Sequence, residues 1–382
     1  MGSACVDGIG DVMEELSSII LDQADRLLRQ HTTKGVLVAA ERGEWAASLW
    51  DALTEAGLPI ALVPQHSGGI GLPPSDVAQL IRRSSYHSVP LPLAETMIAN
   101  AIWAEAGGEA LLKSTTLGPT NQTDRVTLTR GQNGNLLQGT MHAVPWGTRA
   151  DTMLVLAQDE RNGPVLCQLR REQLCSCLPR RNVAYEPRDT VLLDGVLLGD
   201  DQIRSAPSEL HCNGLMIYGA AMRAQQMIGA MERCMDHAIS HASERVQFGR
   251  PIGSFQAVQS MLAVAAGHLA AAVAAGDAAV CADGFAADAF AVAVAKARVG
   301  EAAAHVAAVS HQVLGAMGFT HEHPLHFATR RLWAWRDECG SEFYWQNRIG
   351  QTICAQGGDG FWSFLTESPQ VSLDERLAPW SE

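Results

Sequence analysis

Three successive hydrophobic patterns divide the 382-residue chain and limit the folds open to it. Through residues 1–113 apolar side chains recur three and four positions apart, as at Leu16 and Ile19, which is typical of amphipathic helices. Residues 114–207 carry short β-prone runs between Asn-Gly and Asp-Gly turn signals and predict a small antiparallel barrel or sandwich. Residues 208–382 return to long, Ala-rich helical segments, which predict a four-helix bundle. We therefore expect an α+β fold of three domains with these boundaries, in the order α, β, α.

Composition excludes several classes of protein. A net charge of −13 argues against nucleic-acid binding, which depends on clustered Lys and Arg. The Ala-rich stretch over residues 261–280 is interrupted by Gly267, His268 and Asp277, so we expect no membrane span. Nine irregularly spaced cysteines fit reduced thiols, and the start of the chain lacks a signal-peptide pattern, so we expect a cytoplasmic protein. Cys175 and Cys177 lack a partner pair, and no metal site is predicted.

The strongest local motif runs from Glu244 to Gln259. A long helix is predicted to end at Gly249, a residue common just past a helix end. The chain then passes Pro251 and restarts at Ser254, a good N-cap residue. From composition alone, this pattern also fits a simple corner between two helices of a bundle.

These residues carry a resemblance to a known family. Residues 245–259 resemble the Arg-x-x-Phe-Gly-x-x-Ile-x-x-Phe-Gln-x-x-Gln signature of the FAD-dependent acyl-CoA dehydrogenases. Residues 63–71 resemble the Gly-rich loop of the family's N-terminal domain, and residues 139–151 its central β domain. Residues 312–324 resemble its Gln-x-Leu-Gly-Gly-x-Gly-Tyr-Thr-x-Glu-x-Pro segment, although Ala316 replaces the second glycine. The resemblance thus extends over essentially the whole chain.

The resemblance implies a set of cofactor-binding residues. Arg245 and Phe248 match positions that contact the pyrophosphate and adenine side of FAD in the family, and Gln256 matches another FAD-contacting position. Gln312 and Gly315 match positions that approach the FAD of the neighbouring subunit. An arginine supplies the forked donors that phosphate prefers, and a glycine lets backbone amides approach an anion. The cofactor site is therefore expected at a subunit interface.

The catalytic base departs from the family pattern. In the family a glutamate removes the proton α to the thioester while hydride leaves the β carbon for the flavin N5 atom. Counting from the Gly318 motif places Cys339 at the glutamate position, so Glu338, one residue away, is the candidate base and Asp337 a weaker one. The family's other position for the base falls near Gly219, where no carboxylate is present. A buried structural thiol is the better interpretation of Cys339.

The central domain also departs from the pattern. Only Gly118-Pro119-Thr120 remains of the family's Thr-Glu-Pro-Gly-x-Gly-Ser-Asp stretch, and Ala143-Val144-Pro145 stands for its Trp-Ile-Thr element. Since Pro145 has no backbone N–H, fewer flavin contacts are expected from this domain. The small residues Gly219, Ala220 and Ala221 would permit a bulky acyl group.

Two hypotheses about function follow. The first is a subunit of an acyl-CoA dehydrogenase that oxidises an acyl-CoA thioester, such as a steroid side chain, and passes electrons to an acceptor like electron-transfer flavoprotein. The second is a non-catalytic partner that completes the FAD site of a base-bearing paralogue. Both imply a homo- or hetero-tetramer. A flavin oxidase on the same scaffold is a third option that nothing in the sequence favours. Clustered Trp333, Trp335 and Trp345, which flank the expected base, indicate packing at least as much as chemistry.

Overall fold

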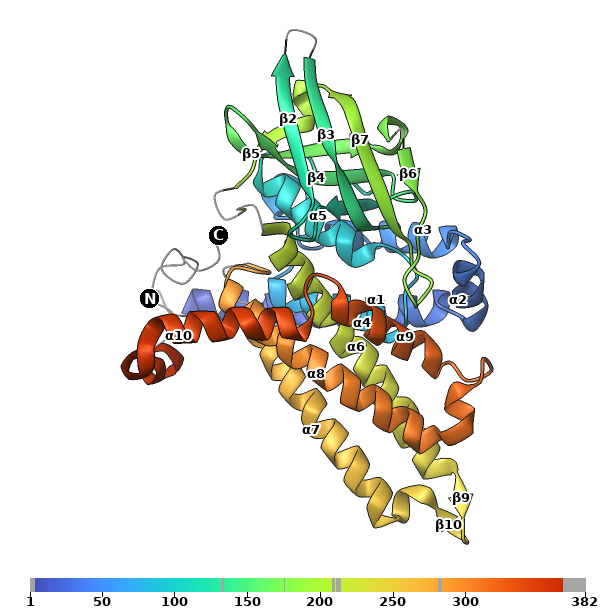
Figure 1. The fold of residues 1–382 in the computed structure, drawn as a ribbon. Coiled ribbons are helices and arrows are strands. Elements are labelled where there is room, and N and C mark those ends of the chain that lie inside the picture. The colour runs from blue at the N-terminus through green and yellow to red at the C-terminus, as the bar shows by residue number, and fades with distance from the viewer. Residues whose placement is uncertain are drawn as a thin grey trace.

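The computed structural model describes residues 4–366, apart from 132–133, 175, 208–209, 211–213 and 281–283. Helices lie at the middle and lower part of the molecule, and the sheet stands above them (Figure 1). Cys175, considered above for zinc, is outside the described residues. Within the described ranges, no group of His, Cys, Asp and Glu side chains is suited to hold a metal ion.

The N-terminal part is helical and ends where the sheet begins. Its helices are α1 (Ala4–His31), α2 (Lys34–Glu41), α3 (Ala47–Glu55), α4 (Pro74–Tyr86) and α5 (Leu93–Glu105). The Gly-rich loop after α3 contains two short 3-10 turns, η1 (Leu58–Ile60) and η2 (Gln65–Ser67). A Cβ atom at Gly69 would lie 2.0 Å from the carbonyl oxygen of Val63, so the loop closes on itself only with glycine there.

The central part is one twisted sheet rather than a purely antiparallel one. Its strands are β1 (Thr115–Gly118), β2 (Arg125–Gly131), β3 (Gly134–Pro145), β4 (Thr152–Asp159), β5 (Gly163–Arg170), β6 (Ser176–Leu178), β7 (Arg188–Leu198) and β8 (Ile203–Ser205). The order is β6-β7-β3-β2-β4-β5-β8, with β1 on β4. The antiparallel prediction is wrong for β4, which pairs in parallel with both β1 and β2. Among the described strands the pairing path stays open at β6 and β8, so no barrel closes.

The C-terminal part is a bundle of long helices: α6 (Gly214–Glu244), α7 (Gln256–Ala278), α8 (Ala289–Leu314), α9 (Leu325–Asp337) and α10 (Glu342–Thr366). The prediction that α6 reaches Gly249 is wrong. The helix ends at Glu244, and a hairpin of β9 (Val246–Gln247) and β10 (Arg250–Pro251) follows. Phe248 and Gly249 form its tip with φ of 51° and 80°, a left-handed conformation that no helix can continue. Ser254 lies in the turn η5 (Ile252–Ser254), and the N-cap of α7 is Phe255.

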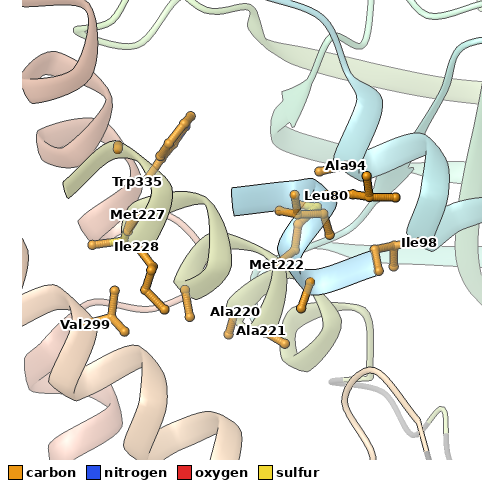
Figure 2. Close-up of a cluster of buried hydrophobic side chains, with 14 of the residues drawn as sticks. Leu80, Ala94, Ile98, Ala220, Ala221, Met222, Met227, Ile228, Val299 and Trp335 are labelled. Carbon is orange, nitrogen blue, oxygen red and sulfur yellow. The ribbon is translucent and has the colours of Figure 1, made fainter. Parts of the chain in front are cut away.

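Helix α6 is the centre of the hydrophobic core. Its apolar side chains point to α4 and α5 on one side and to α8 and α9 on the other (Figure 2). Ala220, Ala221, Met227 and Ile228 are each 0% exposed. A second cluster fills the inner face of the sheet. The N-terminal helices and the bundle therefore share a single core built on α6.

Helix α7 has an unusual surface. Of the described helices it alone has the length and apolarity of a membrane span, with a hydropathy of 1.6, yet only 11% of that stretch is buried. It is one continuous helix that includes Gly267 and His268, as the predicted Ala-rich helical segment requires. The buried residues of α7 are Ala265, Ala272 and Gly276, and its outer side is exposed.

The contact of α4 with α6 generates a prediction about stability. A Cβ atom at Gly229 would lie 1.9 Å from the carbonyl oxygen of Arg82, so Gly229→Ala must push the two helices apart. We expect Gly229→Ala to lower the free energy of unfolding by about 2 kcal/mol or more, measured by urea titration.

Gly267→Ala is the matched control. Gly267 is also in a helix interior, but nothing lies within 4 Å of its added Cβ atom. This substitution should stabilise the chain by about 0.5–1 kcal/mol, the usual gain in helix propensity. Equal effects of the two substitutions would contradict the close approach of α4 and α6.

Candidate functional site

Glu338, the candidate base, lies just after α9 and is held by three donors from other elements. Its Oε1 accepts hydrogen bonds from Arg188 Nε at 2.7 Å and from Asn182 Nδ2 at 3.1 Å. Its Oε2 accepts one from Arg223 Nε at 2.8 Å. Arg188 begins β7, and Arg223 belongs to the core helix α6. The carboxylate thus joins the sheet to the bundle.

The electrostatics make Glu338 a weak proton acceptor. Burial raises the pKa of this carboxyl, but the opposing charges of Arg188 and Arg223 outweigh it and leave the pKa below its usual value. A general base works best with a pKa near the operating pH and with a lone pair free for the incoming proton. The geometry of Glu338 therefore does not favour a catalytic role.

Glu338 is part of a larger buried ion network, defined here as Glu95, Glu186, Glu338, Arg188, Arg223 and Arg331. Arg223 Nη2 donates to Glu95 on α5 at 2.9 Å, and Arg223 Nη1 donates to Gln226. The network balances three guanidinium groups with three carboxylates, as buried charges require.

Glu186 anchors the other half of this network. Its carboxylate accepts hydrogen bonds from Arg188 at 2.9 Å, Arg331 at 3.0 Å and the indole N–H of Trp335 at 2.9 Å. Burial raises the pKa of Glu186, but Arg188 and Arg331 lower it more strongly, to about 2. Trp335 and Trp345 are 2% and 1% exposed, which supports the packing interpretation of the tryptophan cluster, whereas Trp333 is 46% exposed.

The space around the network is nearly full. A cavity of only about 10 Å³ remains, lined by Ser84, Ser85, Val89, Leu91, Ala94, Glu95, Trp146, Glu186, Arg188, Arg223, Gln226 and Trp335. Such a volume holds about one water molecule, whereas sites for small-molecule ligands span roughly 300–1,000 Å³. Ala220 and Ala221, expected to leave room for a bulky acyl group, are instead packed in the core and do not line this cavity.

The two positions at which the resemblance places a base meet in space. A Cβ atom on Gly219 would lie 2.5 Å from Cys339 Sγ and 3.8 Å from the Thr120 methyl carbon. None of these three residues has a carboxylate. Burial raises the pKa of the Cys339 thiol, despite the nearby Arg223, so a reactive thiolate is disfavoured. The thiol fills the place on α6 that a larger side chain at position 219 would need.

A buried lysine fixes the turn that carries Glu338 and Cys339. Lys296, in the middle of α8, is 0% exposed, and its Nζ donates to the carbonyl oxygens of Arg336 at 2.7 Å and Gly340 at 2.8 Å. Burial lowers the pKa of this ammonium group to about 8. Because both carbonyl groups belong to the turn, the direction of the Glu338 side chain is set from α8.

Three of the predicted cofactor residues, Arg245, Phe248 and Gln256, lie at the end of α6 away from Arg223. Along α6, Arg223 and the last residue before Arg245 are 21 positions apart, or about 30 Å. The β9–β10 hairpin occupies the lower tip of the molecule (Figure 1). Phe248 on that hairpin is 93% exposed, and Arg245, Gln256 and Gln312 are exposed as well. In the described part of the chain, no hydrogen bond or ring contact links the hairpin to Gln312 or Gly315.

Comparisons with known proteins show what the chain is similar to. Residues 213–337 match the family described as acyl-CoA dehydrogenase, C-terminal domain. The acyl-CoA dehydrogenase IpdE2 of Mycobacterium tuberculosis is 27% identical over 298 residues, 77% of this chain and 82% of the relative. A variant of the Tcur3481–Tcur3483 steroid ACAD has 25% identity and a TM-score of 0.79, covering 91% of this chain and 99% of the other.

Residues 213–337 thus carry the C-terminal domain of the acyl-CoA dehydrogenase family, and a relative named as an acyl-CoA dehydrogenase matches over most of the chain. The recognised family and the α+β fold are thus confirmed. The fold is also shared with the ChsE4–ChsE5 complex of Mycobacterium tuberculosis, at 22% identity and a TM-score of 0.77 over 88% of this chain and 97% of that one. The family consists of oxidoreductases that act on CH–CH groups, and FAD is its cofactor.

The residues at the distal tip fit one end of FAD. The Arg245 guanidinium has no hydrogen bond or ion pair among the described residues, and the exposed Phe248 ring is held outward by a positive φ. A Cβ atom at Gly315 would meet nothing within 4 Å, so its backbone is open to a ligand. An unpaired guanidinium, an exposed ring and an open glycine suit a phosphate and an aromatic base.

Sequence reasoning missed the arginines that control the network. Arg223 directly follows the apolar run Ala220-Ala221-Met222, and a charged residue beside a buried stripe is a signal that could have been noticed. Arg188 and Glu186 gave no such signal, because besides each other they pair with Glu338 and Arg331, which are 150 and 145 positions away in the sequence.

The network generates a prediction about Glu338. Glu338→Gln removes the shared negative charge and leaves Arg188 and Arg223 facing an amide. We expect the free energy of unfolding to fall by about 3 kcal/mol or more, measured by urea titration at neutral pH, as when one partner of a buried pair is removed. A substitution that left stability unchanged would show that Glu338 is available for chemistry.

Glu301→Gln is the control for that experiment. Glu301 pairs with Arg298 at 3.1 Å on the surface, where the two side chains are 43% and 29% exposed. An exposed pair contributes about 0–1 kcal/mol, so this variant should be close to wild type.

Proposed function

We propose that this chain is the non-catalytic subunit of a heteromeric FAD-dependent acyl-CoA dehydrogenase, and that it completes the FAD site of a base-bearing paralogue. The observation that carries the proposal is the buried ion network, which commits Glu338 to two arginines and occupies the space beside it. A self-sufficient dehydrogenase would need both a free carboxylate and a pocket for the acyl group.

The missing base is the first support. The dehydrogenation requires a group within hydrogen-bond reach of the α proton of the thioester. At the place where Gly219 and Cys339 meet there is a thiol whose pKa burial raises, and a hydroxyl from Thr120. Neither group is suited to accept that proton near neutral pH.

The filled cavity is the second support. An acyl chain would have to displace Trp146, Trp335 or the ion network itself, since the remaining cavity measures only about 10 Å³. Opening it would expose or separate charges whose burial is balanced only in the closed arrangement. We therefore assign acyl-CoA binding, including that of a bulky steroid acyl group, to the paralogue.

Exposed features at the bundle surface are the third support. Among the described residues the Arg245 guanidinium has no hydrogen bond or ion pair, the Phe248 ring is 93% exposed and contacts only the edge of Phe255, and the outer side of α7 is apolar and exposed. A subunit packed against α7 would cover that surface, and a cofactor shared across the interface would meet the hairpin. Two structures of the same fold, ChsE4–ChsE5 and Tcur3481–Tcur3483, carry names of two components.

Each group in the assembled enzyme would then have a defined task. FAD, when bound, accepts the hydride from the β carbon of the acyl group. In this chain Arg245 would hold phosphate, Phe248 would contact the adenine side, and Gln256, Gln312 and Gly315 would border the cofactor. The paralogue would supply the base and the acyl pocket. An acceptor of the electron-transfer flavoprotein type and a tetrameric assembly remain predictions.

The proposal is tested by the visible spectrum of the purified chain. Produced alone, it should carry less than about 0.1 FAD per chain and show no bleaching with an acyl-CoA. Produced with its base-bearing paralogue, it should co-purify as a yellow complex that bleaches with substrate. A solitary chain that binds FAD and is reduced by an acyl-CoA would overturn the proposal.

The half-site is tested within the complex. Arg245→Ala should reduce the FAD content of the co-produced complex at least about tenfold, since a charge-assisted contact to phosphate contributes about 1.5–3 kcal/mol. Arg29→Ala removes an arginine from α1 whose side chain is 73% exposed, and it should leave the FAD content unchanged. Equal FAD content in the two variants would exclude the half-site.

A further inference from the structure

We infer that a cluster of histidines forms an acid-sensitive clamp on the segment 315–326, which contains the turn η6 (Gly315–Phe319) and the start of α9. His237 lies on α6, His311 on α8, and His323 just before α9. Each of the three has a ring nitrogen placed where only the neutral imidazole fits. Protonation would therefore favour release of this segment from the bundle.

His311 holds the turn η6 directly. Its Nε2 bonds to Thr329 Oγ1 at 3.1 Å, and that hydroxyl donates to the carbonyl oxygen of Leu325, so Nε2 carries the proton. Its Nδ1 is buried without a hydrogen-bond partner, and a Cβ atom at Gly318 would lie 3.2 Å from it. The ring also stacks on Phe319, with centroids 4.6 Å apart. A proton on Nδ1 would point into the turn with no acceptor.

His323 fixes the start of α9. Its Nδ1 accepts a hydrogen bond from the backbone N–H of Leu325 at 3.1 Å. A backbone amide can only donate, so this contact exists only while Nδ1 is unprotonated. The carbonyl oxygen of His323 also accepts from His326 Nδ1 at 2.8 Å. Protonation of Nδ1 would break the first of these bonds at the helix start.

His237 faces His323 from α6. The two rings meet edge to face, with centroids 5.0 Å apart, and His237 Nε2 is buried without a partner. Arg233 and Asp236, on the same helix, are the charged groups near His237. Burial is the main cause that lowers the pKa of His237, with Arg233 and His323 adding to it, and the result is about 4.

The other groups facing the cluster mostly oppose a further positive charge. His323 is surrounded by His241, His326, Arg233 and His311, and burial together with these groups lowers its pKa. Burial alone lowers the pKa of His311. Burial also lowers the pKa of His326, where Arg330 and His321 add to the effect and Glu41 opposes it.

The sign of the pH effect follows from these directions. In the released segment each histidine returns toward its ordinary pKa of about 6.5 and binds a proton that the closed form excludes. The closed form is therefore fully stable above about pH 6.5 and loses stability as the pH falls below that value. For one histidine with a closed-form pKa near 4, the opening equilibrium rises about tenfold between pH 7.5 and 5.5.

The test is hydrogen exchange of the backbone amides of 315–326 in the isolated full-length chain, at about pH 7.5 and 5.5 and corrected for intrinsic exchange. We expect at least about tenfold more opening at the lower pH, while amides in the middle of α6 change less than twofold. An acid response below about twofold in 315–326 would overturn the inference.

The experiment uses neither FAD nor a paralogue, so its result is independent of the proposed function. The proposed function enters only in the consequence of release, which would weaken the FAD and subunit contacts proposed for Gly315.

Neutral replacements identify the groups responsible. The variant His237→Gln, His311→Gln, His323→Asn cannot be protonated at these positions and should lose most of the acid response. The control variant His31→Gln, His66→Gln removes two histidines of the N-terminal helical part and should keep it. If the triple variant does not fold, each single variant should lower the response at least about threefold. If the acid-induced opening of 315–326 is unchanged in the single variants, other groups cause it and the clamp is rejected.

Discussion

The charge on Arg223 is the constraint on which the rest of the structure depends. This guanidinium lies on the helix that forms the core, is 1% exposed, and cannot lose its proton at any physiological pH. It must therefore be matched by carboxylates that stay ionised, and Glu95 and Glu338 meet that need from two other elements. A carboxylate held in this way is a poor proton acceptor, because accepting a proton would leave a buried positive charge unmatched. The joining of α5, α6 and the end of α9 and the commitment of Glu338 to an ion pair thus have one cause.

The same network explains why so little space remains between the sheet and the bundle at this place. Arg188, Glu186, Arg331 and Trp335 fill space between sheet and bundle with groups that satisfy one another. Buried ion networks contribute modest net stability compared with apolar packing, but they require precise placement. The network fixes how the sheet meets the helices. The surface at the far end of the bundle then presents the same exposed residues whether or not catalysis occurs in this chain.

The order of the three parts could be predicted from the sequence because periodicity and glycine placement are local signals. Local signals also misled the prediction of where α6 ends. Gly249 lies at the tip of a hairpin, because the chain turns at Phe248, whose positive φ has no sequence signature. The parallel pairing of β4 with β1 and β2 depends on contacts between distant segments. For the site, the gap in the base motif at Cys339 was visible, and so was the lack of a carboxylate near Gly219. Only the tertiary structure shows that these two positions touch and that Glu338 turns toward Arg188.

The surface of the bundle indicates that the chain is incomplete by itself. A 23-residue helix with a hydropathy of 1.6 is only slightly buried along its apolar stretch, and an aromatic ring is 93% exposed on a strained hairpin. Exposed apolar area costs about 25 cal/mol per Å² relative to buried area, and a positive φ in a non-glycine residue adds about 1–2 kcal/mol. The described contact of the Phe248 ring, edge to face with Phe255, leaves most of that ring exposed. Association with another subunit would bury the apolar side of α7. A shared cofactor would give the exposed Phe248 ring a binding partner. Both features therefore fit a protein that works in an assembly.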